Sequence, residues 1–173
     1  MPDLGKPLRL ITLKTVDSQA PLGLGHQGYI DEIQFRWLEA ELADAHAHNE
    51  LIIIVSHHGS DEMSFTSPTS GKSLQDALLK TPGVVLHLTG HGHKNTKHYI
   101  SGSERGYWEL MLTSTLDFPM QSRLIEIVNE SNGYASIYIT NVGHNSPQSS
   151  LAHKARNLAA AKLAFIELIR GRV

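Results

Sequence analysis

Apolar runs and regularly spaced apolar residues divide the first half of the chain into strands and helices. Two largely aliphatic runs, at 51–55 and 84–88, are typical of strands that are buried on both faces of a sheet. A shorter run at 8–13 predicts a strand ahead of them. The segments 31–48 and 73–80 have helical patterns, so a helix is predicted before each long strand. This alternation of strands and helices indicates an α/β fold.

The first predicted helix has a recognisable start. Asp31 can accept a hydrogen bond from the first helical turn, and Gln34 follows it in the position of a capping box. The apolar residues of this segment recur at helical spacing and form the expected buried stripe, which consists of Ile30, Ile33, Trp37, Leu38, Leu42 and Ala45.

The pattern changes in the second half of the chain. Short runs of β-forming residues predict a series of antiparallel strands at 99–100, 107–112, 123–128 and 134–140. Asn132-Gly133, between the last two, is a strong hairpin signal. A final helix is predicted over 150–170, with one apolar face formed by Leu151, Ala155, Leu158, Leu163, Ile166 and Ile169. We therefore expect a mixed sheet with antiparallel C-terminal strands and a terminal helix.

Composition narrows the class of protein. The 173 residues can bury a sizeable core, and the absence of cysteine excludes disulfides, thiolate metal sites and a cysteine nucleophile. A net charge of −2 argues against a nucleic-acid scaffold role. No aliphatic run approaches the length of a membrane span, and the first residues contain no apolar signal core. We therefore expect a cytoplasmic protein without membrane contact.

Charge is unevenly distributed along the chain. The segment 151–172 carries five Lys and Arg residues against the single acid Glu167, so the final helix is basic and the remainder is acidic. This pattern is typical of a solvated polar face, and it also suits docking of the helix on the acidic body or on a partner.

The chain contains 11 histidines, and two groups of them follow the predicted buried strands. His57 and His58 come directly after 51–55, and Gly90-His91-Gly92-His93 comes after 84–88. Ligand sites of α/β sheets form at the carboxyl ends of strands, and imidazole is a common ligand of transition metals. Gly90 and Gly92 permit turn dihedrals that would aim His91 and His93 at one place. We therefore predict a metal site.

The histidines divide into three groups. His57, His91 and His93 are the predicted metal ligands. His58 could support a ligand, contact a substrate or have no role, and His87, inside a strand, is interpreted as a core or supporting residue. The remaining six are interpreted as ordinary surface or hydrogen-bonded histidines: His26, His46, His48, His98, His144 and His153.

These residues resemble the C-terminal half of the calcineurin-like metallophosphoesterases. Gly90-His91-Gly92-His93 matches the most specific late motif of that family, and the strand ending in His57-His58 matches the preceding histidine strand, although Gly59 and Ser60 stand where many members have proline. Further similarity, over about residues 8 to 140, lies in Gln34, Trp37-Leu38, Tyr107-Trp108-Glu109, Asp117-Phe118-Pro119, Gln121, Arg123 and Glu126.

The resemblance implies a fold, a cofactor and a substrate. The fold would be half of an α/β/β/α sandwich, formed by a partial domain at 1–145 and followed by a helical extension at 146–173. Two ions of Mn, Fe or Zn would be bound, one by His57 and His91 and the other by His93. The reaction would be hydrolysis of a small phosphate ester.

Three earlier motifs of the family are missing: Asp-x-His after the first strand, Gly-Asp-x-x-Asp and Gly-Asn-His. The one literal match, Asp44-Ala45-His46, lies in the first predicted helix and is interpreted as a coincidence. We therefore expect half of a phosphoesterase site, completed by a separate N-terminal half or by self-association. Two alternatives stay open. One is an inactive metal-binding or interaction remnant. The other is a metallo-β-lactamase-fold hydrolase, suggested by His57-His58-Gly59-Ser60 but lacking that fold's earlier histidine motif.

Overall fold

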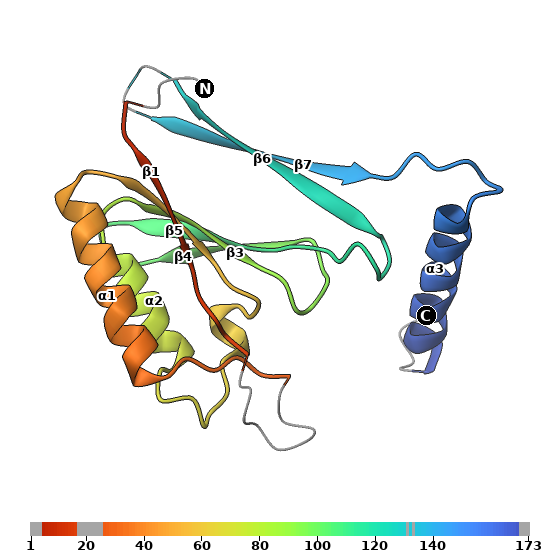
Figure 1. The fold of residues 1–173 in the computed structure, drawn as a ribbon, viewed down its shortest axis with the longest axis horizontal. Coiled ribbons are helices and arrows are strands. Elements are labelled where there is room, and N and C mark those ends of the chain that lie inside the picture. The colour runs from red at the N-terminus through yellow and green to blue at the C-terminus, as the bar shows by residue number, and fades with distance from the viewer. Residues whose placement is uncertain (1–4, 17–25, 131, 133, 170–173) are drawn as a thin grey trace.

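The computed structural model describes residues 5–16, 26–130, 132 and 134–169. A five-stranded sheet lies at its centre (Figure 1), in the order β1 (Leu8–Thr12), β2 (Leu51–Val55), β3 (Val84–Thr89), β5 (Gly106–Met111) and β4 (Thr96–Ser101). The parallel pairing of β1, β2 and β3 agrees with the α/β prediction. The sheet is mixed, as predicted: β5 pairs antiparallel with β4, and it also pairs parallel with β3, which the predicted series of antiparallel strands did not include. The chain passes first to the edge position and then returns between β3 and β4.

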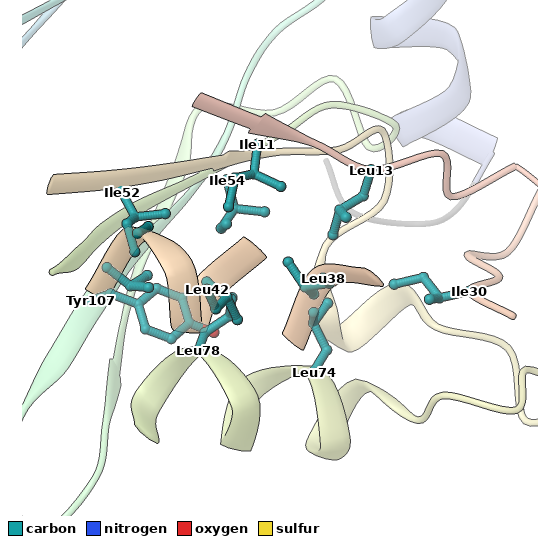
Figure 2. Packing of buried hydrophobic residues seen from close by; sticks show 12 residues of the cluster. Ile11, Leu13, Ile30, Leu38, Leu42, Ile52, Ile54, Leu74, Leu78 and Tyr107 are labelled. Atoms are coloured by element: carbon teal, nitrogen blue, oxygen red, sulfur yellow. The ribbon is translucent and has the colours of Figure 1, made fainter. Parts of the chain in front are cut away.

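Helices cover one face of this sheet. Both α1 (Glu32–Ala47) and α2 (Gly71–Lys80) lie on the same side of it (Figure 1). Their buried side chains meet those of β1 and β2 in one core (Figure 2), which includes Ile11, Leu13, Ile30, Leu38, Leu42, Ala45, Ile52, Ile54, Leu74, Leu78, Val84 and Tyr107.

A two-stranded ribbon covers the opposite face. It consists of β6 (Gln121–Asn129) and β7 (Ala135–Gly143), which pair antiparallel as the hairpin signal predicted. Ile53 of β2 and its neighbours Leu86 and Leu110 are buried beneath Ile125 and Ile127 of β6. Covering on both faces explains why β2 is apolar at every position. Of the predicted turn, Asn132 accepts a hydrogen bond from the backbone of Tyr134, whereas residue 133 lies outside the described residues.

The start of α1 differs from the predicted capping box. The Asp31 carboxylate accepts a hydrogen bond from the Gln34 backbone at 2.7 Å, as expected for an N-cap. The Gln34 side chain, however, makes two 2.8 Å hydrogen bonds with the backbone of Lys14. It therefore ties α1 to the segment after β1. Two members of the predicted stripe point outward: Ile33 is 74% exposed and Trp37 is 44% exposed.

The last helix, α3 (Leu151–Ile169), stands beside the sheet and the ribbon (Figure 1) and has no buried residue. Its predicted apolar face is not a buried one, since Leu151 and Leu158 are 83% and 73% exposed. The apolar spacing correctly predicts a helix, but the face of the sheet that would cover it is already covered by the ribbon. No described helix is long and apolar enough to cross a membrane.

The connection after β2 is fixed by close packing against α2. A short 3-10 helix (Ser60–Glu62) follows β2, and the start of α2 lies directly against it. A Cβ atom added to Gly71 would lie 1.8 Å from the Ser60 carbonyl oxygen, so only glycine fits there. This contact helps to hold the residues that follow β2.

Gly71→Ala is expected to destabilise the fold, although alanine is the better helix former by about 1 kcal/mol. The added methyl group would force the Ser60 carbonyl away from α2. We expect the free energy of unfolding, measured with urea, to fall by about 1–3 kcal/mol. Gly143→Ala is the control, since no atom lies within 4 Å of the added Cβ. Stabilisation by Gly71→Ala, or equal losses in the two variants, would contradict this packing.

Candidate metal centre

Parallel pairing of β2 with β3 brings the two histidine groups to the same edge of the sheet. The pairing continues beyond both strands, because the Ser56 N–H donates to the Leu88 carbonyl at 3.0 Å and the Gly90 N–H donates to the His57 carbonyl at 2.9 Å. The backbones that carry His57 and His91 are therefore held side by side.

Three imidazoles come together at this edge. The His57 Nε2 and His91 Nδ1 atoms are 3.2 Å apart. His58 joins them, with its ring centroid 4.4 Å from that of His91, and one ring nitrogen of each of the three lies within 4.8 Å of the others. Nitrogen atoms at this spacing can converge on one metal ion. The group thus contains the predicted ligands His57 and His91 together with His58, and His93 is not part of it.

His58 is the most constrained of the three. Its side chain is buried, and both its backbone N–H and its Nδ1 atom lie 3.1 Å from the hydroxyl oxygen of Thr15. Its Nε2 atom is also buried and makes no hydrogen bond of normal geometry with a described residue, although the His26 backbone lies close enough to act on this ring. Because a buried polar atom without a partner is costly, this nitrogen is suited to act as a ligand of a metal ion.

Burial favours the neutral form of His57 and His58. Burial, followed by the charges of His91 and His57, lowers the pKa of His58 to about 4. Burial and the charge of His91 also lower the pKa of His57, while the nearby Glu62 carboxylate acts in the opposite direction. Neutral imidazole is the form that binds metals, so the environment favours the ligand state.

The backbone conformation of the Gly90-His91-Gly92-His93 segment differs from the prediction. The left-handed residues are the histidines themselves, with φ of 53° at His91 and 51° at His93, so the expectation of unusual dihedrals at Gly90 and Gly92 is wrong. Gly92 lies close to the Met111 side chain, since an added Cβ would lie 2.6 Å from the Met111 sulfur and the flexible end of Met111 would have to move. Strained backbone dihedrals at residues whose side chains carry chemistry are typical of functional sites.

A buried polar network supports the strand ends. His87 Nδ1 donates to the Glu109 carboxylate at 2.7 Å, and His87 Nε2 lies 2.8 Å from the Ser56 hydroxyl. The Ser56 hydroxyl in turn donates to the His58 carbonyl at 2.7 Å. His87 therefore lies in the core, as its place in a strand predicted, and holds the backbone of a histidine in the group.

Glu109 is the anionic end of this network. Burial raises the pKa of the Glu109 carboxyl. The hydrogen bond and charge of His87 and the hydrogen bonds from Ser60 together lower this pKa by more, so the net shift is downward. The Ser60 hydroxyl donates to Glu109 at 3.2 Å and accepts from the Gln75 amide at 2.8 Å. The network thereby links β5, the connection after β2, and α2.

His93 lies on a separate arrangement. Its Nδ1 donates to Asp117 Oδ2 at 2.7 Å, and Asp117 Oδ1 lies 3.5 Å from the Lys162 ammonium of α3. The hydrogen bond from His93 is the main cause of the lowered pKa of Asp117. A carboxylate that accepts from Nδ1 leaves Nε2 as the ligating nitrogen, a pattern common among metal-bound histidines.

Other residues of the site were not singled out as candidate ligands or supports from the sequence. Glu62 accepts a 2.8 Å hydrogen bond from the Gly59 backbone and places its charge beside His57. Its position a few residues after a strand-end histidine was the available signal. No sequence pattern identified Thr15, because it is distant from His58 in the sequence and contacts it only in the folded chain. Asp44 pairs with Arg9 at 2.7 Å, which supports the interpretation of Asp44-Ala45-His46 as a coincidence.

Comparison with known proteins finds one short match to a curated relative. Over 78 residues the chain is 30% identical to a probable cyclic nucleotide phosphodiesterase from Synechococcus sp. (strain WH7803), and the match covers 42% of this chain and 29% of that protein. No family model matches the chain. The match links this sequence to a phosphodiesterase over less than a third of the relative's length.

The fold is also found in a solved structure. The chain resembles Thermus thermophilus sulfate thiohydrolase SoxB in complex with glycerol, with a TM-score of 0.51 and 16% identity, over 91% of this chain and 26% of that one. This likeness shows the fold alone, a mixed α/β arrangement with parallel and antiparallel strands and a C-terminal helix, as the sequence predicted.

Glu109→Gln is expected to destabilise the protein, because one neutral amide cannot accept hydrogen bonds from His87 and Ser60 as a carboxylate does. We expect a loss of about 1–3 kcal/mol in the free energy of unfolding, the cost of a buried polar group left unsatisfied. Asp76→Asn is the matched control, since it breaks an exposed pair with Lys72 and should cost under ~0.5 kcal/mol. Similar losses in both variants would contradict a structural role for the buried network.

Proposed function

We propose that this chain contributes metal ligands to a phosphoesterase that hydrolyses small phosphate esters at two metal ions. His57, His91 and His58 would hold one ion, and His93 would hold the second. The observation that carries the proposal is the convergence of three imidazoles at the ends of β2 and β3, with the His58 Nε2 atom buried and unpartnered.

The donor set fits a transition metal. Two nitrogens bound to one tetrahedral ion at about 2.0–2.1 Å lie roughly 3.3–3.4 Å apart, close to the separation of the His57 and His91 nitrogens. That separation is 3.2 Å. Neutral imidazoles suit Mn, Fe and Zn alike, so the donor set supports a metal of this class without selecting one.

Bound metals would polarise a phosphate ester and supply a nucleophile at neutral pH. The chain's own residues hold the ligands in place. Ser56 fixes the His58 backbone, and Asp117 fixes the His93 ring so that Nε2 faces outward from the hydrogen bond. Glu62 is the candidate for an anionic ligand, because its charge already acts on His57.

The remaining ligands would come from residues outside this sequence. The Asp-x-His, Gly-Asp and Gly-Asn-His motifs of the family have no counterparts in this sequence. Glu109 and Asp117 are already engaged, by His87 and His93 respectively. We infer that a separate N-terminal half, or a second copy, would complete the site.

A second candidate function is metal binding without hydrolysis. The engagement of Glu109 and Asp117 favours it, because it leaves few anionic donors near the histidines. The metallo-β-lactamase alternative is less well supported, since the likeness to SoxB favours the metallophosphoesterase type of fold.

The metal proposal predicts that one equivalent of Mn²⁺ or Zn²⁺ binds at the three histidines. His91→Ala should weaken binding at least tenfold in calorimetric titrations, because it removes one of the three converging nitrogens. His98→Ala is the control, since His98 lies exposed on β4 outside the group. Retention of full affinity in His91→Ala, or an equal loss in His98→Ala, would refute the site.

The proposal of an incomplete ligand set has its own prediction. The purified chain, supplied with Mn²⁺, should hydrolyse bis(4-nitrophenyl) phosphate little above the rate of free Mn²⁺, although it binds the metal. Release of nitrophenolate measures this directly. Rapid hydrolysis that disappears in His91→Ala would mean that the chain needs no further ligands.

A further inference from the structure

A cavity of about 490 Å³ lies between α3 and the loops that carry His93 and Asp117. One wall is formed by the loop after β3, a second by the loop before β6, and a third by α3. Its volume falls in the range of small-molecule sites, roughly 300–1,000 Å³. The cavity therefore begins beside the proposed second metal ligand and extends away from it.

One side of this cavity favours an anion. Lys94 and Lys162 both line it, and Asp117 is the carboxylate among its lining residues. Asp117 already accepts from His93 and pairs with Lys162. The Lys94 ammonium makes no hydrogen bond or ion pair with any described residue. Two ammonium groups against one committed carboxylate leave net positive charge next to His93.

The other side is apolar. Phe118, Leu163 and Ile166 line it, together with Pro119 and Ala159. These side chains offer no hydrogen-bonding groups, so they suit an uncharged ring or hydrocarbon group. Leu163 and Ile166 come from α3, which lies outside the part of the chain that resembles the phosphoesterase family. The helix therefore adds an apolar wall to a charged site.

We propose that this cavity binds a phosphate ester whose alcohol part is a ring-sized apolar group. The phosphate would lie between Lys94, Lys162 and His93, and the ring would pack against Phe118, Leu163 and Ile166. The inference rests on the proposed function, since it names the substrate class of that site. It also gives α3 a role, because the bound ring would cover side chains that the sheet does not bury.

Cysteine labelling tests this placement, because the chain contains no cysteine of its own. Two alanines of α3 form a matched pair: Ala159 lines the cavity, and Ala161 is exposed and does not line it. Alkylation of Ala159→Cys by iodoacetamide should slow at least fivefold with saturating phenyl phosphate. Alkylation of Ala161→Cys should be unchanged. Glycerol phosphate, which has the same phosphate on a polar alcohol, should protect only at higher concentrations.

A second substitution tests the apolar wall. In the Ala159→Cys background, Ile166→Asn should reduce the preference for phenyl phosphate over glycerol phosphate roughly tenfold, the loss expected for removing one apolar contact surface. Leu158→Asn, on the exposed side of the same helix, should leave the preference unchanged. Circular dichroism checks that both variants retain the helix.

The outcomes separate this inference from the proposed function. Equal protection by phenyl and glycerol phosphates, or equal protection of Ala159→Cys and Ala161→Cys, would overturn the inference even if Mn²⁺ binds at the histidines. Repeating the alkylation assay with a chelator tests whether the cavity binds phenyl phosphate without a bound metal. If Mn²⁺ binding fails, the phosphoesterase proposal fails, whereas selective protection of Ala159→Cys by phenyl phosphate would still support the cavity.

Discussion

The parallel pairing of β2 with β3 is the constraint on which the rest of the site depends. The backbone hydrogen bonds from Ser56 to Leu88 and from Gly90 to His57 extend this pairing beyond the strands. They bring residues from positions 57 and 91 into contact although more than 30 residues separate them. The pairing is itself held by burial on both faces, with helices on one side and the β6–β7 ribbon on the other.

Buried polar contacts then convert this alignment into a defined arrangement of side chains. The pair of His87 and Glu109 is buried within the sheet. His87 contacts the Ser56 hydroxyl, which donates to the His58 carbonyl, so hydrogen bonds connect the core to the site. A buried charged group must have partners, so each member of this network limits where the others can lie. The same principle, applied to the buried Nε2 atom of His58, indicates that a metal ion would bind there.

The sequence predicted the elements and the meeting of the two histidine groups, because apolar runs and strand order are local signals with one common geometric outcome. It did not predict that β5 lies parallel to β3, since sheet order depends on contacts between distant segments. It did not predict the positive φ angles of His91 and His93, because residues other than glycine rarely adopt the left-handed region and no local sequence pattern marks these two. The exposure of Ile33 and of α3 was missed because apolar spacing identifies a helix without identifying what covers it.

The central claim is that imidazoles from both strand ends bind one metal ion, and X-ray absorption spectroscopy of the zinc-loaded chain tests it most directly. The zinc-loaded chain should show nitrogen or oxygen neighbours at about 2.0–2.1 Å and outer-shell scattering from at least two imidazole rings. A spectrum without imidazole scattering, or one that is unchanged when His57 and His91 are both replaced, would contradict it.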